Sequence, residues 1–551
     1  MSWTIAKRAL SAFAALCVIG SSAACSKISS QVGSGGANAW TIPGVVRIGS
    51  YEDLDNLNPT LSDEAFVSDV CQMIYSGLID YDDHAEAVPD VARAIPTRRN
   101  GGISADGRTI VYHLRRGVRF SDGVALTSAD VAFTWRQIVN PANNVPYRYP
   151  YDQVASVATP DPYTVVVHLK APSAPFTAYF MRNGIVGSIL PKHLLDRYAD
   201  LNRVAFNSHP IGSGPFVVSK WVAGSLLEMT ANPDYWRGRP RLKRIDYEII
   251  PNQNTLLTAL RSGDLDVYYS LPETQHALVA ALPGYRVTVT PNMTFEHIVF
   301  NSGKPPLNDR SVRRAMAYAI DWKRIAQDVY LGLDPPGMAD QPPMLWAFDP
   351  AVKPYPHDAA LARTLLAAAG WRAGPDGVLT KDGQRFAIVL TTVAGVTTRE
   401  NAEVLIQRDL RDVGIEVSVR NYPANLLFAT YGTGGILQHG KFDLALFAWS
   451  LSVPDPDDTQ TIGPDQLPPA GLNYTFYADP AIGADQAIAR TNYDRAVRRA
   501  AYWRIQRRIY DAVPEHTIVW RSTIDAVNTD LKNFRPTPAV SDFWNIYDWD
   551  I

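Results

Sequence analysis

Residues 442–458 read FDLALFAWSLSVPDPDD, and this stretch decides the class of fold. Its first part, Phe442 to Trp449, is nearly all apolar, which is typical of a strand covered on both faces by helices. A turn-rich loop follows at the carboxyl end of this strand. Because ligands of open α/β sheets lie beyond the carboxyl ends of strands, the segment predicts a ligand site. Its predicted ligand-facing residues are Trp449, Ser450, Ser452 and Val453. In the alternative interpretation, Trp449 only caps the core and the Pro-Asp repeats only form turns.

Segments on either side of this stretch show a mixture of strand and helix signals. Thr109–Leu114 and Thr164–Leu169 are short β-branched runs bounded by turn residues, as strands are. Two successive helices are also expected, the first capped by Asp309 or Ser311 and the second capped by Asp321. Strands and helices that do not alternate strictly indicate an α/β protein with several sheets.

The amino-terminal residues predict export. Lys7 and Arg8 precede an apolar run that is too short to span a membrane as a mature helix. The run ends in the small residues before Cys25, which resembles the lipobox of bacterial lipoproteins, although Ser22 replaces the usual leucine. We expect a signal peptide at 1–24, lipidation of Cys25, and a Ser/Gly-rich flexible tether at 25–39. The alternative is ordinary secretory cleavage, which would release a free soluble protein.

Length and charge restrict the classes of function. A chain of 551 residues exceeds the size of one hydrophobic core, so two or three lobes with a cleft between them are expected. The net charge is -3 with acids and bases interspersed, which excludes the basic stripe of a nucleic-acid-binding protein. Cys71 lies among apolar residues at helical spacing, and we expect a buried, inert thiol there.

No motif for catalysis or for a dedicated metal site is visible. The ten histidines are scattered singly, and the sequence contains neither HExxH nor a Gly-x-Ser-x-Gly nucleophile elbow. Residues 80–83, Asp-Tyr-Asp-Asp, resemble part of a calcium loop but lack its glycine and its terminal glutamate, so a solvated turn is expected. We therefore predict a protein that is not an enzyme and has no cofactor and no bound metal.

Four stretches together resemble the bacterial extracellular solute-binding proteins of family 5, the peptide and nickel receptors of ABC importers. The similar region covers about 88–465. The motifs are LRRGVRFSDG at 114–123 leading to LTSADV at 126–131, GSGPF at 212–216 leading to NPDYW at 232–236, KPPLND at 304–309 leading to AYAID at 317–321, and 442–457.

Two of these motifs also have a local physical interpretation. Thr127 and Asp130, three residues apart, form a capping pair before the next helix. Gly212 and Gly214 permit backbone angles that other residues resist, and we expect them to serve a sharp turn near the crossover between lobes. Both motifs are therefore expected to be structural.

The resemblance implies a fold of the periplasmic-binding-protein-like type II class, a two-lobed clamp with an extra small subdomain. Lobe I would comprise 40–78, 186–290 and 511–551, subdomain II 79–185, and lobe III 291–510. The chain would cross between the lobes twice and close over its ligand. The partners implied are a small solute, an ABC permease and its ATPase, and a membrane reached through the lipid anchor.

The ligand strand departs from the pattern of the peptide-binding members. In those members an aspartate pairs with the α-amino group of the ligand, and Ser452 occupies that position here. Some members carry an arginine where this chain has Leu446. A buried ammonium without a carboxylate is costly, so Asp455 or Asp457 would have to replace the missing partner.

A second ligand-facing segment is expected near the C-terminus, where family members bring a strand back to the cleft. Trp520 would form an aromatic wall and Arg521 a partner for a carboxylate. The alternative for these two residues is a packed aromatic side chain beside a solvated arginine.

The sequence thus predicts the substrate-binding component of an ABC importer, a monomer held at the periplasmic or cell-surface side of a membrane. Its solute would be a peptide or a peptide-like compound. The alternatives are a non-peptide solute, such as an oligosaccharide, an opine-like compound or a metal chelate, and a sensory lipoprotein that uses the same fold.

Overall fold

The computed structural model describes residues 38–146, 148–180, 182, 187–338, 340–451, 453–539 and 541–551. The sheets, helices and hydrophobic cores belong to the compact unit formed by residues 40–551. The predicted signal peptide, Cys25 and nearly all of the predicted tether lie outside the described residues. None of the helices in the described part is both long and apolar enough to cross a membrane.

A mixed ten-stranded sheet runs through residues 40–551 in the order β16-β15-β17-β11-β18-β10-β1-β9-β8-β7. Its strands are β1 (Val45–Ser50), β7 (Phe216–Val222), β8 (Leu226–Ala231), β9 (Arg244–Ile249), β10 (Val267–Tyr268), β11 (Tyr285–Phe300), β15 (Ala387–Thr391), β16 (Glu416–Val419), β17 (Leu444–Ser450) and β18 (Glu515–Asn528).

Smaller sheets are formed by β2 (Ile79–Tyr81) with β3 (Ala87–Pro89), by β4 (Thr109–His113), β6 (Thr164–Leu169) and β5 (Val154–Asp161), and by β12 (Arg372–Ala373), β13 (Leu379–Lys381) and β14 (Gln384–Arg385). The helices are α1 (Ala65–Ile74), α2 (Ser128–Val139), α3 (Lys192–Leu195), α4 (Gln253–Ser262), α5 (His276–Ala280), α6 (Arg310–Ala319), α7 (Trp322–Asp328), α8 (Ala359–Ala368), α9 (Thr397–Asp412), α10 (Ala424–Leu427), α11 (Thr459–Ile462), α12 (Pro480–Thr491) and α13 (Arg495–Ala512).

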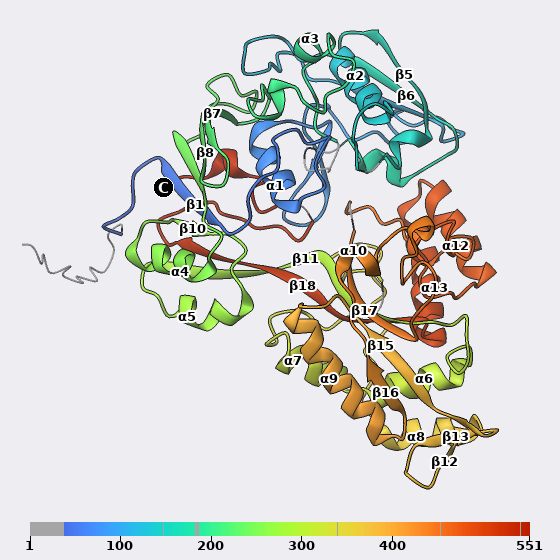
Figure 1. The fold of residues 1–551 in the computed structure, drawn as a ribbon. Helices are drawn as coiled ribbons and strands as arrows, with labels where there is room; N and C mark the ends of the chain where they lie inside the picture. The colour runs from blue at the N-terminus through green and yellow to red at the C-terminus, as the bar shows by residue number, and fades with distance from the viewer. Residues whose placement is uncertain are drawn as a thin grey trace, which may run out of the picture. The chain divides into compact units, whose positions relative to one another are not determined.

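Two lobes are built on the two ends of the large sheet. We call the part around β10, β1, β9, β8 and β7 the first lobe, and the part around β16, β15 and β17 the second lobe. The long strands β11 and β18 pair with each other and connect the two lobes (Figure 1). The α/β class, with several sheets and a two-lobed arrangement, is confirmed.

Three large hydrophobic cores accompany these sheets. The core of the first lobe draws on 46–75, 190–269 and 527–549, with Phe133 added from outside them. A second core fills the second lobe, and a third lies around β4, β5, β6 and α2. We call residues 78–189 the small-sheet module. The domain boundaries expected from the sequence stay a prediction.

The predicted strands and helix caps are present. The strands expected at Thr109–Leu114 and Thr164–Leu169 are β4 and β6, and they pair antiparallel. The carboxylate of Asp130 accepts a hydrogen bond from the backbone N of Thr127 at 2.8 Å. Asp309 caps α6 by accepting from the backbone N of Ser311, and Asp321 caps α7.

Strand β17 confirms the apolar prediction, but its two faces are covered differently. Leu444 and Leu446 join the core that α6 to α9 cover, whereas Ala445 and Phe447 join a smaller core formed with α10 and irregular segments. The expectation of helices on both faces is therefore only half right. Short connecting segments supply enough apolar side chains to cover the second face.

Cys71 is buried on α1, as expected, with 1% of its surface exposed. Its sulfur lies 3.8 Å from the backbone oxygen of Leu57. Burial raises the pKa of the thiol and keeps it protonated at neutral pH. The interpretation as an inert core thiol is confirmed.

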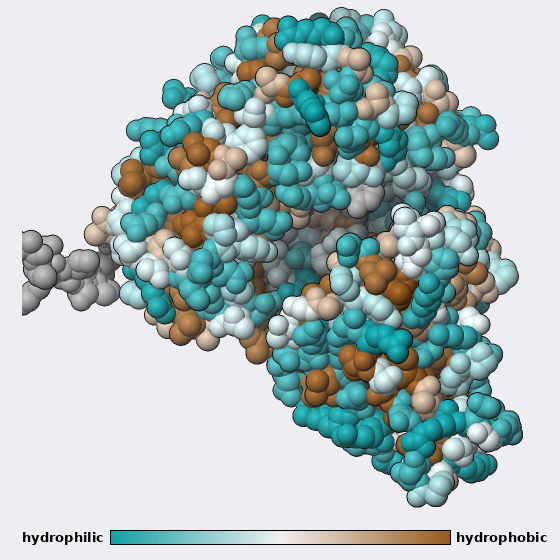
Figure 2. Space-filling model, in the orientation of Figure 1, coloured by the Kyte–Doolittle hydropathy of each residue, from teal (hydrophilic) through white to brown (hydrophobic). Residues whose placement is uncertain are grey.

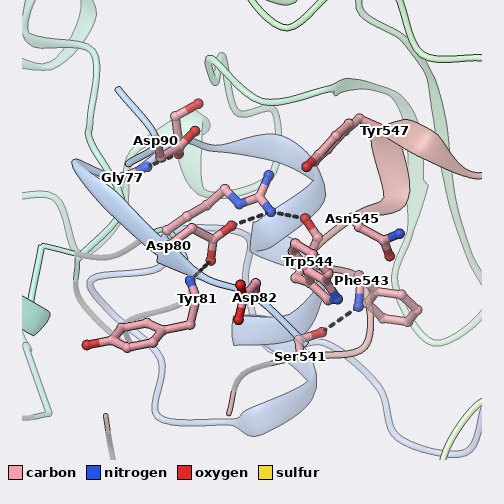
Figure 3. Close-up of polar contacts among 12 residues, drawn as sticks. Gly77, Asp80, Tyr81, Asp82, Asp90, Ser541, Phe543, Trp544, Asn545 and Tyr547 are labelled. Carbon is pink, nitrogen blue, oxygen red and sulfur yellow. Dashed lines mark hydrogen bonds and ion pairs between the residues drawn. The ribbon is translucent and has the colours of Figure 1, made fainter. Parts of the chain in front are cut away.

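The solvated turn predicted at residues 80–83 is wrong for Asp80. Asp80 lies in β2 with 1% of its surface exposed and pairs with the buried Arg182 at 2.6 Å (Figure 3). Burial raises its pKa to about 6, and the guanidinium opposes this shift. Tyr81 is also buried in β2, whereas Asp82 behaves as expected, since its carboxylate accepts from backbone N atoms in the turn. Asp80 can be buried in this short strand because Arg182, from a distant segment, neutralises its charge.

Gly212 and Gly214 serve a close approach of backbones and not the sharp turn expected from the sequence. A Cβ atom on Gly212 would lie 1.9 Å from the backbone oxygen of Ile74, and one on Gly214 would lie 2.5 Å from its backbone carbon. The backbone N of Gly214 donates to the same oxygen at 2.8 Å. The motif therefore fixes the end of α1 against the segment that precedes β7.

We expect Gly212→Ala to destabilise the fold by about 1–3 kcal/mol, because the new methyl group must displace the Ile74 backbone. The thermal unfolding midpoint measures this loss. Gly432→Ala is the matched control, since a Cβ atom there meets nothing within 4 Å. Equal unfolding midpoints for the two variants would contradict the assignment.

Candidate functional site

Strand β17 has an open edge at its carboxyl end. Antiparallel pairing with β11 runs from Leu444 to Ser450, whereas parallel pairing with β15 ends at Ala445. The hydroxyl of Thr392 donates to the backbone oxygen of Leu446 at 2.6 Å and is the last contact on that side. Within the described part of the chain, residues 447–450 therefore have a strand neighbour on one side only. Figure 2 shows that the surface is hollowed between the two lobes.

Trp449 stands at this edge with its indole partly buried. The ring stacks on Tyr474 with centroids 6.0 Å apart and an interplanar angle of 22°. Phe447 contacts it edge-on at 5.5 Å. Gln438 orients the tyrosine by donating to its hydroxyl at 3.2 Å. Packing on one side fixes the indole and leaves part of its surface exposed.

The remaining predicted residues of this segment differ in exposure. Ser450 is exposed, and its hydroxyl lies 2.5 Å from that of Thr294 on β11. Ser452 lies outside the described residues. Val453 is 4% exposed and packs into the core of the small-sheet module. Its burial gives it a packing role, and its predicted contact with a ligand stays a prediction.

Trp520 and Arg521 lie on β18 where the two lobes meet. Trp520 is 1% exposed and packs on Phe295, with ring centroids 4.8 Å apart. Arg521 forms ion pairs with Glu273 and, at 3.2 Å, with Asp334. The packed aromatic of the alternative interpretation is thus present, but the arginine beside it is paired and not solvated. Any ligand carboxylate at Arg521 would have to replace an internal one.

The aspartates after β17 are engaged with the protein itself. Asp455 forms a bidentate ion pair with Arg498 at 2.7 and 3.0 Å. Asp457 accepts from the phenol of Tyr149 at 2.8 Å and from the hydroxyl of Thr459. Leu446 is fully buried in the core of the second lobe. Neither aspartate is therefore left to take the place of the carboxylate missing at Ser452.

An ion pair beside the open edge was missed by the sequence analysis. Glu296 lies opposite Ala448 in the β11–β17 ladder, and Arg399 binds it in bidentate fashion at 2.8 and 3.1 Å. The glutamate is 7% exposed, so the pair supplies the partner that a buried charge needs. The two residues are 103 positions apart, and no local pattern signals the contact.

Burial shifts the pKa values of titratable groups near the strands β11 and β18, which connect the lobes. Burial lowers the pKa of His297, between Phe295 and Phe447, to about 3, so the imidazole is neutral. Burial raises the pKa of Asp334 to about 6, and Arg521 opposes the shift. Among the described residues, no group of three His, Cys, Asp or Glu side chains is arranged to hold a metal ion. The arrangement suits binding through backbone groups, aromatic surface and hydroxyls.

Comparisons with known proteins agree with this geometry. The model of the bacterial extracellular solute-binding proteins, family 5 Middle, matches residues 86–462. Oligopeptide-binding protein AppA of Bacillus subtilis is 28% identical over 91% of this chain and 90% of its own length. Protein XP55 of Streptomyces lividans is 32% identical over 92% of this chain and 89% of its own length.

Solved structures extend the comparison to three dimensions. AppA in complex with a nonapeptide superposes with a TM-score of 0.71 at 27% identity, covering 92% of this chain and 99% of AppA. NikA from Brucella suis in complex with Fe(III)-EDTA has a TM-score of 0.77 at 22% identity, covering 92% and 99%, and shows the shared fold. The family model matches more than half of the chain, and the two-lobed fold is shared with the solved structures. The chain therefore belongs to the bacterial extracellular solute-binding proteins of family 5.

Proposed function

We propose that this protein captures a peptide or peptide-like solute outside the cytoplasmic membrane and delivers it to the permease of an ABC importer. The observation that carries the proposal is the one-sided pairing of residues 447–450. An extended chain can add to such an edge through main-chain hydrogen bonds, with side-chain pockets providing specificity. Trp449 then offers its exposed ring surface to the solute. The nonapeptide bound to AppA supports the same chemistry.

The surroundings favour a solute without a free amino group at this point. A buried ammonium needs a carboxylate, and Ser452 cannot supply one. Asp455 and Asp457 already bind Arg498 and Tyr149. A peptide whose amino terminus is blocked, or which enters in another register, meets no such cost.

The same missing carboxylate favours a second candidate, a non-peptide solute. An oligosaccharide, an opine-like compound or a metal chelate would bind to hydroxyls, backbone groups and aromatic surface without needing an anchor for an amine. Fe(III)-EDTA in NikA is a chelate held in the same fold. A metal would then arrive inside its organic ligand. A sensory lipoprotein of the same fold would bind its solute in the same way and would differ in having no permease partner.

Trp449→Ala is expected to weaken solute binding about tenfold, the equivalent of roughly 1.4 kcal/mol, because the aromatic contact is lost. Ser452→Asp is expected to shift preference toward peptides with a free amino terminus, because it restores the carboxylate. Isothermal titration with a library of short synthetic peptides, in free and N-acetylated form, measures both effects. The compound released from the purified protein, identified by native mass spectrometry, serves as a second probe.

Trp221→Ala is the control, since this partly buried tryptophan lies on β7 of the first lobe. Unchanged affinity in both Trp449→Ala and Ser452→Asp would overturn the site assignment. Binding of a non-peptide compound that still depends on Trp449 would keep the site and select the second candidate.

Contacts between the second lobe and the small-sheet module support a closed clamp. The phenol of Tyr493, between α12 and α13, lies 2.8 Å from the backbone oxygen of Gly107 and 3.1 Å from that of Ser173. The backbone N of Ala174 donates to the oxygen of Arg490 at 2.7 Å. We call these contacts the latch. The two contacts of the Tyr493 phenol span 386 and 320 positions of the sequence, so separation of the second lobe from the module must break them.

Tyr493→Phe is expected to loosen the latch by about 1 kcal/mol, the net contribution of a hydrogen bond, and to speed opening about fivefold. Hydrogen exchange at the Ala174 amide, followed by mass spectrometry of fragments spanning 170–180, reports the opening. Tyr431→Phe, at an exposed tyrosine of the second lobe, is the control. If the two variants exchange at the same rate, the latch does not hold the clamp.

We also propose that Cys25 carries a lipid anchor that holds the monomeric protein at the periplasmic or cell-surface side of a membrane. The proposal is supported by the basic start, the apolar run and the small residues before Cys25. Residues 26–38, rich in Ser and Gly, would give the anchored domain the reach to meet its permease.

Wild-type protein expressed with its full leader is expected to enter the detergent phase, and Cys25→Ser the aqueous phase, because a lipid chain adds apolar surface. Partitioning in a phase-separating detergent measures the difference. Cys71→Ser provides the control for loss of a thiol alone. Wild-type protein found in the aqueous phase would indicate ordinary secretory cleavage.

A further inference from the structure

Two buried carboxylates neutralise two inner arginines beside the small-sheet module. Asp80 lies 2.6 Å from Nη2 of Arg182, which also donates to the backbone oxygen of Trp544 (Figure 3). Asp90 lies 3.3 Å from Nη2 of Arg237. Asp80 and Asp90 are 1% and 0% exposed, so their charges are committed to these partners. The carboxylates of Asp80 and Asp90 are therefore not available to other arginines nearby.

Trp236 stacks with a third arginine, Arg115. The guanidinium carbon of Arg115 lies 4.7 Å from a ring centroid of Trp236, and that of Arg237 lies 4.6 Å away. The Nε of Arg115 donates to the backbone oxygen of Asp90 at 2.8 Å. Stacking and this hydrogen bond hold the guanidinium plane of Arg115 in place. Its two Nη groups have no hydrogen-bond partner in the part of the chain that the structure describes.

Two further arginines complete the surface. Arg93 and Arg116 are exposed, and across the described ranges neither has a carboxylate within 4.0 Å. The guanidinium of Arg116 lies 4.7 Å from the ring centroid of Tyr163 and is held by the same kind of stacking. Three guanidinium groups thus come together, and aromatic rings orient two of them.

These arginines line two adjoining hollows. The first, of about 580 Å³, is lined by Arg93, Arg115, Arg116, Gly117, Val118 and Trp236 and has no acidic side chain. The second, of about 410 Å³, shares Arg93 and Arg116 with the first. It also contains Asp161, whose carboxylate accepts from the backbone N of Tyr163 at 2.8 Å. The first hollow is therefore the more positive of the two, and we call it the arginine hollow.

We propose that the arginine hollow binds a phosphate group, independently of the solute site at β17. Guanidinium forks donate paired hydrogen bonds to phosphate oxygens, and aromatic stacking leaves their N–H edges directed away from the ring. Three cations without a carboxylate within 4.0 Å in the described ranges suit a group that carries more than one negative charge; the nearest acidic side chain named here, Asp161, lines only the second hollow. Trp236, Gly117 and Val118 provide walls without competing acceptor side chains.

Such a phosphate has two possible sources, a soluble phosphate ester or the headgroup of an anionic lipid. The second source would hold the small-sheet module against the membrane, and the first would make the hollow a separate solute site. Both require the same arginines. Vesicles and a soluble phosphate therefore distinguish the sources, while substitution of the arginines tests the site.

Inorganic pyrophosphate is the soluble probe, titrated calorimetrically into the full chain. Phosphatidylglycerol vesicles, compared with phosphatidylcholine vesicles in a sedimentation assay, are the lipid probe. All variants carry Cys25→Ser, so that no lipid anchor carries the protein to vesicles. The test variant is Arg93→Gln with Arg116→Gln, and Arg116→Lys keeps the charge but removes the fork.

We expect saturable binding of at least one probe, weakened at least tenfold in the double variant and to a lesser degree in Arg116→Lys. Arg197→Gln is the matched control, because Arg197 is exposed and stacks over Tyr198 at 5.0 Å outside both hollows. Binding should fall as salt concentration rises. Thermal unfolding of each variant checks that the exposed substitutions leave the fold intact.

Pyrophosphate binding that depends on the two arginines identifies a soluble phosphate ester as the source. Binding confined to phosphatidylglycerol vesicles, with the same dependence, identifies the lipid headgroup. The proposal is overturned if the Cys25→Ser protein with all its arginines intact binds neither probe saturably, or if the double variant binds as tightly as Arg197→Gln.

Discussion

The antiparallel pairing of β11 with β18 is the interaction on which the rest of the structure depends. These strands are 16 and 14 residues long, and they are the members of the large sheet that belong to both lobes. The pairing shifts register between Pro291 and Phe295, and again between Glu296 and His297. Because a register shift interrupts the ladder and bends the strand, the two strands bend in the part that lies between the lobes.

The proposed solute site depends on the same pair of strands. β11 covers one side of β17 as far as Ser450, while β15 stops pairing at Ala445 and leaves the other side open. The charged side chains beside β11 and β18 form ion pairs within the protein. Glu296 pairs with Arg399, and Arg521 pairs with Asp334. A buried charge that lost its partner would cost several kcal/mol, so these groups are held in place. Backbone groups, hydroxyls and the ring of Trp449 are then what the edge offers a solute.

In the small-sheet module, charged side chains are held in two different ways, by ion pairs and by aromatic stacking. Its buried carboxylates, Asp80 and Asp90, are engaged by Arg182 and Arg237, whereas two of the three arginines of the arginine hollow are held by aromatic rings. Ion pairing commits a guanidinium to an internal partner, but stacking leaves its N–H groups available. The crossing strands β11 and β18 and the module thus differ in electrostatics although both contain arginines.

The sequence by itself determined the features that depend on neighbouring residues. These are the apolar strand ending at Trp449, the β-branched strands of the module, the caps at Asp130, Asp309 and Asp321, and the family motifs. Alternation and capping act over a few positions, so no distant partner is needed to recognise them. Only the tertiary structure decided that Asp80 meets Arg182, that Arg521 meets Asp334, and that Gly212 touches Ile74. A pattern shows that a side chain is buried, but the chain must fold before the segment that covers it, and the charge that neutralises it, are defined.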